Sequence, residues 1–250
     1  MIEINENNIP LIQIFDEVIQ QKNSKLFILR EDLIHPEISG NKWRKLKYNI
    51  QNTKTKGKTL LTFGGAYSNH IAATAAAGKY YNLNTIGVIR GEQTLPLNPT
   101  LSLAKENGMQ FKYVSREDYR RKYSAEFLDA LQKEFGDFYI VPEGGSNTLA
   151  VKGCAEILEN ININFDVICC ACGTGGTIAG IISSTPKKVL GFPALKGGEF
   201  LKQDINNLLK EYSINSVYEN WELILDYHFG GYAKVKPELI EFVRRFYISH

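Results

Sequence analysis

Short apolar runs rich in β-branched residues alternate with longer amphipathic or alanine-rich stretches along the chain. Such runs predict strands, and the stretches between them have helical spacing. The predicted strands span residues 25–30, 59–63, 84–89, 110–114, 138–141, 167–171 and 188–192. Parallel strands need crossovers of roughly a dozen residues or more, which these intervals supply. The pattern therefore predicts an α/β fold with open parallel sheets and right-handed crossovers.

Composition and charge narrow the classes of partner. The 250 residues are 44% hydrophobic and 22% charged, as in ordinary globular proteins. A net charge of +2 without a basic block predicts no nucleic-acid partner. No apolar run approaches the ~20 residues of a membrane span, and residues 1–10 are too polar for a secretory signal. We expect a cytoplasmic protein that binds neither nucleic acid nor membrane.

The four cysteines, at positions 154, 169, 170 and 172, are predicted to serve packing. Three of them share one predicted strand, where neighbouring side chains point to opposite faces, which argues against a disulfide framework. Cys170 and Cys172 lack a second cysteine or histidine pair at metal-ligand spacing. We predict no metal site.

A helix is predicted to open at residues 40–41, with apolar residues at helical spacing and four basic residues on its remaining surface: Lys42, Arg44, Lys45 and Lys47. Most of these charges are expected to face solvent. Lys42 differs because it lies in the first turn, where free backbone amides disfavour an ammonium group. A lysine destabilised in this way can act as an amine nucleophile, although this evidence alone favours an ordinary surface lysine.

A glycine-rich turn follows the strand at 167–171. It contains Gly173, Thr174, Gly175, Gly176 and Thr177, and an apolar helical stretch comes next. Converging backbone amides, two hydroxyls and a helix N-terminus favour a phosphate site, while a tight structural turn is an equally good interpretation. The turn fits neither the dinucleotide fingerprint, since Ile178 stands at its last glycine, nor the Walker motif. A monophosphate ligand fits better than a dinucleotide.

Two further turns follow strands in the same way. Residues 64–70 end in Ser68, Asn69 and His70, which present a hydroxyl, an amide and an imidazole at a helix N-terminus. Ser68 or Asn69 could simply cap the helix, but the cluster is richer than a cap requires and suits a carboxylate. The third turn, residues 142–147, contains Gly145 and Ser146. Ligands collect at the carboxyl ends of parallel strands, so we expect the three turns to surround one cleft.

Five motifs, taken in order, resemble the family of D-cysteine desulfhydrases and 1-aminocyclopropane-1-carboxylate deaminases. They are Leu-Arg-Glu-Asp-Leu at 29–33, Gly-Asn-Lys-Trp-Arg-Lys-Leu at 40–46, Gly-Gly-Ala-Tyr-Ser-Asn-His at 64–70, Pro-Glu-Gly-Gly-Ser-Asn at 142–147 and Gly-Thr-Gly-Gly-Thr at 173–177. Each motif is weak alone, and the ordered set is specific. The resemblance runs from about residue 8 to about residue 180, and more loosely to residues 191–193.

The resemblance implies an α/β fold of two open parallel-sheet domains, the tryptophan synthase β-like fold type II of pyridoxal-phosphate enzymes. It implies a small domain of residues 48–145 inserted into a large one of residues 1–47 and 146–250, and a homodimer. The implied cofactor is pyridoxal 5'-phosphate, joined to Lys42 as an internal aldimine. The implied phosphate ligands are Gly173, Thr174, Gly175, Gly176 and Thr177, and Asn69 would bond the phenolic oxygen. The implied substrate-binding residues are Ser68, Asn69, His70, Gly145 and Ser146, with Ser68 also assisting catalysis.

The implied activity is that of a deaminating lyase on a small amino acid. D-cysteine would give pyruvate, ammonia and hydrogen sulfide by β-elimination, and aminocyclopropane carboxylate would be ring-opened. The family's Asp-Pro-x-Tyr-x-Gly-Lys segment is not found, so we expect a C-terminally shortened member of weakened activity, with Tyr227 or Tyr232 as candidate replacements for its tyrosine. The alternatives are a non-catalytic protein that binds pyridoxal phosphate or another phosphate ligand, and another reaction at Lys42, such as racemisation or cysteine synthesis.

Overall fold

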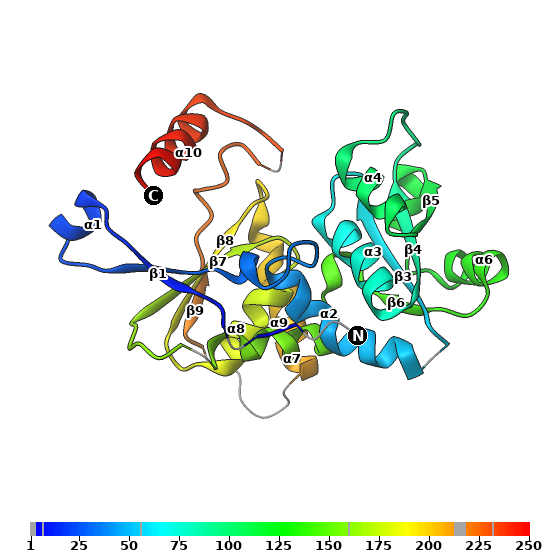
Figure 1. Cartoon of the computed structure of the whole chain (residues 1–250), viewed down its shortest axis with the longest axis horizontal. Helices are drawn as coiled ribbons and strands as arrows, with labels where there is room; N and C mark the ends of the chain where they lie inside the picture. The colour runs from blue at the N-terminus through cyan, green and yellow to red at the C-terminus, as the bar shows by residue number, and fades with distance from the viewer. Residues whose placement is uncertain (1–3, 7, 56, 160, 213–218, 232) are drawn as a thin grey trace.

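Two parallel sheets organise the chain in a computed structural model that describes residues 4–6, 8–55, 57–159, 161–212, 219–231 and 233–250 (Figure 1). The first sheet has the order β5-β4-β3-β6. Its strands are β3 (Thr59–Gly65), β4 (Asn84–Arg90), β5 (Gln110–Val114) and β6 (Tyr139–Val141). Its crossover helices are α3 (Asn69–Tyr81), α4 (Pro99–Glu106), α5 (Arg116–Arg120) and α6 (Ala125–Phe135). The apolar side chains of β3 and β4 fill the core on both faces of this sheet.

The second sheet has the order β7-β8-β9 and is also parallel. Its strands are β7 (Val167–Cys172), β8 (Lys188–Pro193) and β9 (Trp221–Leu223). Its helices are α7 (Thr148–Ala155), α8 (Gly176–Ser184) and α9 (Leu201–Tyr212). Their apolar faces form one buried cluster with Cys172 and Val189 of the sheet.

The remaining elements lie outside the two sheets. Strands β1 (Leu11–Ile14) and β2 (Leu26–Leu29) pair antiparallel around the short helix α1 (Glu17–Gln21), and α10 (Pro237–Ser249) closes the chain. Short 3-10 helices occur at Glu31–Leu33, Glu143–Gly145, Glu156–Leu158 and Gly198–Phe200. No helix in the described ranges is long and apolar enough to cross a membrane.

The strand predictions are confirmed, because each of the seven predicted runs forms a strand within two residues of its expected ends. The prediction missed β1 and β9, which have four and three residues. Runs this short carry few alternations, although β2 and β6, with four and three residues, were found. The packing role of Cys170 and Cys172 is also confirmed, since Cys172 is buried in the second core and Cys170 packs against it.

Helix α2 (Asn41–Thr55) packs against α7 beside the second sheet and against α3 beside the first. The prediction that its basic residues face solvent was wrong. Arg44 and Lys45 are 2% and 3% exposed. Arg44 donates two hydrogen bonds to Glu31, at 3.1 and 3.0 Å, and Lys47 pairs with Glu6 at 2.9 Å. Arg44 and Lys47 therefore bind carboxylates that are distant in the sequence, where the prediction expected water.

Helices α2 and α7 approach each other closely at Gly153. A Cβ atom at this position would lie 1.9 Å from the carbonyl oxygen of Arg44, so only a glycine fits without moving one helix. This contact fixes the distance between α2 and the second sheet.

We therefore predict that Gly153→Ala lowers the free energy of unfolding by about 1 to 3 kcal/mol, or more, because the added methyl group meets a backbone atom. Urea unfolding followed by circular dichroism measures this. Gly65→Ala is the matched control, since its Cβ would meet nothing closer than an Arg90 nitrogen at 3.6 Å. Equal stability of the two variants would contradict the close approach.

Candidate cofactor-binding site

Lys42 is the second residue of α2, and its side chain is largely withdrawn from water. Burial lowers the pKa of its ammonium group, with a smaller opposing effect from Cys154. The expectation of a low pKa therefore holds, but removal of water, rather than the helix amides, is its main cause. Within the described part of the chain, the amine has no side-chain hydrogen bond or ion pair. It is a partly desolvated amine without a hydrogen-bond partner.

The glycine bend at 173–177 lies against the start of α2. The bend leads from β7 into α8, and Gly175 takes the left-handed φ of 78° that lets the chain turn. Asn41, which precedes Lys42, donates a 2.6 Å hydrogen bond to the hydroxyl of Thr177. The structure thus brings the predicted lysine and the predicted phosphate bend together.

Lys45 is the residue that sequence reasoning missed. Its Nζ donates hydrogen bonds to the Gly144 carbonyl at 2.9 Å, the Ser146 hydroxyl at 3.1 Å and the Thr174 hydroxyl at 3.3 Å. Burial, and then the charge of Lys42, lower the pKa of Lys45 to about 8. Its spacing of three residues from Lys42 was the available signal, because such residues share a helix face.

The third turn, residues 142–147, contacts both of the other two turns. The hydroxyls of Ser146 and Thr174 are 2.6 Å apart. On its other side, Gly145 lies under the ring of His70: a Cβ there would be 3.0 Å from His70 Cε1. Residues from all three predicted turns therefore meet around Lys45.

The three predicted substrate-binding residues at the start of α3 differ in burial and in their hydrogen bonds. Ser68 caps the helix by accepting a 3.4 Å hydrogen bond from the Ile71 amide, as the simpler interpretation had it. Asn69 is exposed, and so is Gly173 in the phosphate bend. In the described structure, no side-chain hydrogen bond links Ser68 or Asn69 to the group around Lys45. His70 alone of this cluster is buried.

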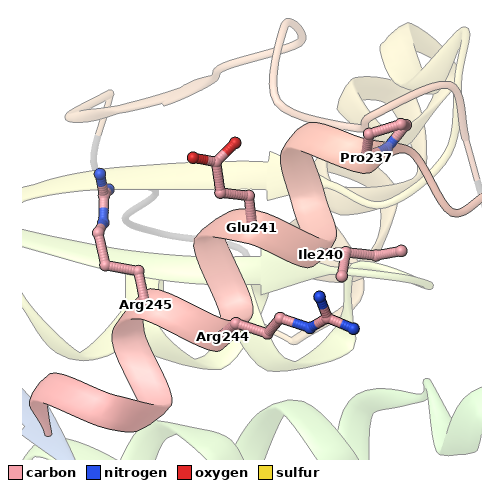
Figure 2. Close-up of a pocket in the computed structure, with 5 residues that line it drawn as sticks. All are labelled: Pro237, Ile240, Glu241, Arg244 and Arg245. Carbon is pink, nitrogen blue, oxygen red and sulfur yellow. The ribbon is translucent and has the colours of Figure 1, made fainter.

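A pocket elsewhere on the chain is a separate feature. It is lined by residues of α10 only: Pro237, Ile240, Glu241, Arg244 and Arg245 (Figure 2). None of the predicted site residues lines it. Of the two tyrosines named as replacements for the family's tyrosine, Tyr227 packs its ring on Phe192 at 5.8 Å and Tyr232 lies outside the described residues.

The arrangement matches a known class of protein. A model of the family described as pyridoxal-phosphate dependent enzyme matches residues 2–197. The chain therefore belongs to the pyridoxal-phosphate dependent enzymes, and pyridoxal phosphate is its cofactor. The residues present fit this group, because a phosphate needs donors such as the Lys45 ammonium and the Thr174 and Ser146 hydroxyls, and an aldehyde needs a desolvated amine such as Lys42.

Individual relatives show which members of this family the chain is similar to. It is 30% identical to a putative 1-aminocyclopropane-1-carboxylate deaminase of Pyrococcus horikoshii, over 94% of this chain and 76% of that protein. It is 31% identical to a bifunctional D-cysteine desulfhydrase/1-aminocyclopropane-1-carboxylate deaminase of Arabidopsis thaliana, over 89% of this chain and 61% of that protein. The solved structure of an ACC deaminase homologue matches with a TM-score of 0.84 and 27% identity, covering 96% of this chain and 78% of that one. The predicted tryptophan synthase β-like fold, type II among these enzymes, is confirmed.

The burial of Lys45 should appear in the pH dependence of stability. Its pKa is about 8 in the folded chain, below the ordinary value of 10.5 expected after unfolding. Between these values the unfolded chain holds more protons, so the contribution of Lys45 to the free energy of unfolding rises as the pH rises from about 8 to 10.5.

We predict that Lys45→Met removes this rise, which is worth roughly 3 kcal/mol at most. Urea unfolding at a series of pH values measures it. Lys202→Met, at an exposed position of α9, is the control and should keep the wild-type slope. An unchanged slope in Lys45→Met would show that this ammonium group is not desolvated.

Proposed function

We propose that the chain is a deaminating lyase that uses pyridoxal phosphate to act on a small amino acid, either D-cysteine or 1-aminocyclopropane-1-carboxylate. One observation carries the proposal. The partly desolvated amine of Lys42, which has no hydrogen-bond partner, lies near the ammonium group of Lys45 and the hydroxyls of Thr174 and Ser146 that bind it. The names of the relatives, which include a D-cysteine desulfhydrase of Serratia proteamaculans at 28% identity, support this choice of substrates.

The phosphate is held, in this proposal, by the start of α8 and by Lys45. The bend at 173–177 offers backbone amides at a helix N-terminus, where an anion is stabilised. Lys45 adds a positive charge, and the hydroxyls of Thr174 and Thr177 add donors. The family's glycine bend is thus supplemented by a lysine that reaches it from α2.

When bound, pyridoxal phosphate delocalises the electron pair left on the substrate carbon after a proton departs. Lys42 is the base that takes this proton, because burial lowers its pKa and favours the neutral amine. Ser68 and Asn69, at the N-terminus of α3, bind the substrate carboxylate, and Asn69 also bonds the phenolic oxygen of the cofactor. Gly145 leaves room for the ring of His70, and Ser146 orients the turn through its hydrogen bond to Thr174.

The proposal extends to the domain division, the oligomeric state and the cellular compartment. Residues 48–145 form a small domain inserted into a large domain of residues 1–47 and 146–250, and the site lies where the two meet. The protein is a cytoplasmic homodimer. The unpaired cysteines support a reducing compartment. Exposed apolar side chains on α10, including Val243, Tyr247 and Ile248, support an interface.

We predict that the purified protein with pyridoxal phosphate absorbs visible light, that borohydride bleaches this absorbance, and that Lys42→Ala abolishes both the absorbance and turnover. Release of hydrogen sulfide and pyruvate from D-cysteine, and of ammonia from the cyclopropane substrate, measures activity. Lys105→Ala, at an exposed position of α4, should behave as wild type.

Three outcomes separate the alternatives. Absorbance without any product would favour a binding protein without catalysis. Racemisation or cysteine synthesis without deamination would change the reaction but keep Lys42. Full turnover by Lys42→Ala would refute the assignment.

A further inference from the structure

The third turn, residues 142–147, is built around two successive glycines. Gly144 and Gly145 have left-handed φ values of 65° and 74°, a conformation that side-chain-bearing residues rarely adopt. A backbone hydrogen bond from the Gly145 amide to the Pro142 carbonyl oxygen, at 2.8 Å, closes the turn. Glycines lose more conformational freedom on folding than other residues, so such a turn needs further contacts to present its atoms in one arrangement.

Tyr123 and Lys122, in the segment between α5 and α6, supply such contacts. The Tyr123 hydroxyl accepts a 3.0 Å hydrogen bond from the backbone amide of Glu143. The Lys122 ammonium group lies 3.3 Å from a carboxylate oxygen of Glu143, and the Lys122 side chain is 16% exposed. Glu143 is therefore held at its backbone and at its side chain.

The first sheet holds these two residues in turn. The Tyr123 ring packs edge to face on Phe63 of β3, with the ring centroids 5.3 Å apart, and Phe63 is fully buried. The Lys122 ammonium group lies over the rings of Tyr119 and Tyr123, at 4.7 and 5.0 Å from their centroids. Tyr119 also packs on Phe63. We call Lys122 and Tyr123 the anchor of the third turn.

Gly144, the residue after the anchored one, contacts the predicted cofactor site. Its carbonyl oxygen accepts a 2.9 Å hydrogen bond from Lys45 Nζ, the shortest of the three that this amine donates. A Cβ atom on Gly144 would lie 2.6 Å from Thr174 Oγ1, so the turn also packs closely on the phosphate bend. Within the described residues, the anchor makes no side-chain hydrogen bond to Lys45, and the connection runs through the backbone of residues 143–144.

We propose that Tyr123 and Lys122 are positioning residues that, by holding Glu143, keep the Gly144 carbonyl oxygen within hydrogen-bond distance of the Lys45 ammonium group. A hydrogen bond to a charged donor stabilises the charge, so the anchor acts on Lys45 without contacting it. The consequence for the cofactor rests on the proposed function: a Lys45 that keeps its proton attracts the phosphate group, and the anchor supports that attraction from outside the site.

The first test removes the Tyr123 hydroxyl. Tyr123→Phe keeps the ring on Phe63 but takes the acceptor away from the Glu143 amide. The pKa of Lys45 should then fall below its value of about 8, by roughly half a unit to one unit, because a weaker hydrogen bond stabilises the ammonium form less. Nuclear magnetic resonance titration of ¹⁵N-lysine in cofactor-free protein measures this, with Lys45→Met to assign the signal. Tyr113→Phe is the matched control, since it removes a hydroxyl that has no hydrogen-bond partner in the described structure.

The second test removes the Lys122 charge. Loss of a positive charge would by electrostatics alone raise the pKa of Lys45, so a fall in Lys122→Met identifies a displaced turn. Lys122→Arg keeps the ion pair with Glu143 and should restore the wild-type pKa. The other groups that act on the charge of Lys45, which are Lys42, Cys154, Cys170 and Cys172, are present in every variant.

Hydrogen exchange of the amides at 142–147, followed by mass spectrometry, separates positioning from a merely structural role. Exchange should speed up by about tenfold in Tyr123→Phe and Lys122→Met. Faster exchange with an unchanged Lys45 pKa would overturn the proposal, and so would no change in either quantity. Because these measurements use cofactor-free protein, a chain that shows the coupling but binds no pyridoxal phosphate would refute the proposed function alone.

Discussion

The buried ion pair between Arg44 and Glu31 is the constraint on which the site depends. Two parallel hydrogen bonds, at 3.1 and 3.0 Å, join a guanidinium group that is almost without water to a carboxylate from the turn that follows β2. Loss of Arg44 leaves the largely buried Glu31 carboxylate without its partner, which costs about 3 to 5 kcal/mol, whereas Arg44 also pairs with Glu6. Arg44 lies between Lys42 and Lys45 on α2. With its side chain fixed toward Glu31, the rotation of the helix is set, and Lys45 is directed at the glycine bend.

The same helix joins the two halves of the chain. It packs on α7 beside the second sheet and on α3 beside the first (Figure 1). Gly153 of α7 lets the backbones of the two helices approach closely at the carbonyl group of Arg44. The three turns could not meet around Lys45 without this placement. The turn at 142–147 has a carbonyl and a hydroxyl in contact with the lysine, and the bend at 173–177 has a hydroxyl. The glycines shape the turns, but a lysine from a third element connects them.

The sequence was informative where the signal is local and uninformative where it depends on distant partners. Each strand of five residues or more carried its own alternation or apolar run, and the order of the motifs identified the fold and Lys42 as a candidate. Helical spacing assigned Arg44 and Lys45 to solvent because charges are normally exposed. Their burial depends on acceptors elsewhere, and those of Lys45 are 99, 101 and 129 positions away. No pattern within one helix reports such partners. His70 was identified as a candidate, but its burial and its 2.8 Å contact with the Thr62 hydroxyl of β3 depend on the tertiary fold.

Two neighbouring lysines and a neutral histidine make this region short of negative charge. The charge of Lys42 lowers the pKa of Lys45, and both charges lower that of His70. An anion bound at the bend would reverse the first effect, since a dianionic phosphate stabilises the ammonium form of Lys45. It would also have to displace at least one of the three oxygens that now accept from Lys45. Cofactor binding and the protonation of Lys45 are therefore linked, and the affinity for the phosphate depends on the proton that Lys45 retains.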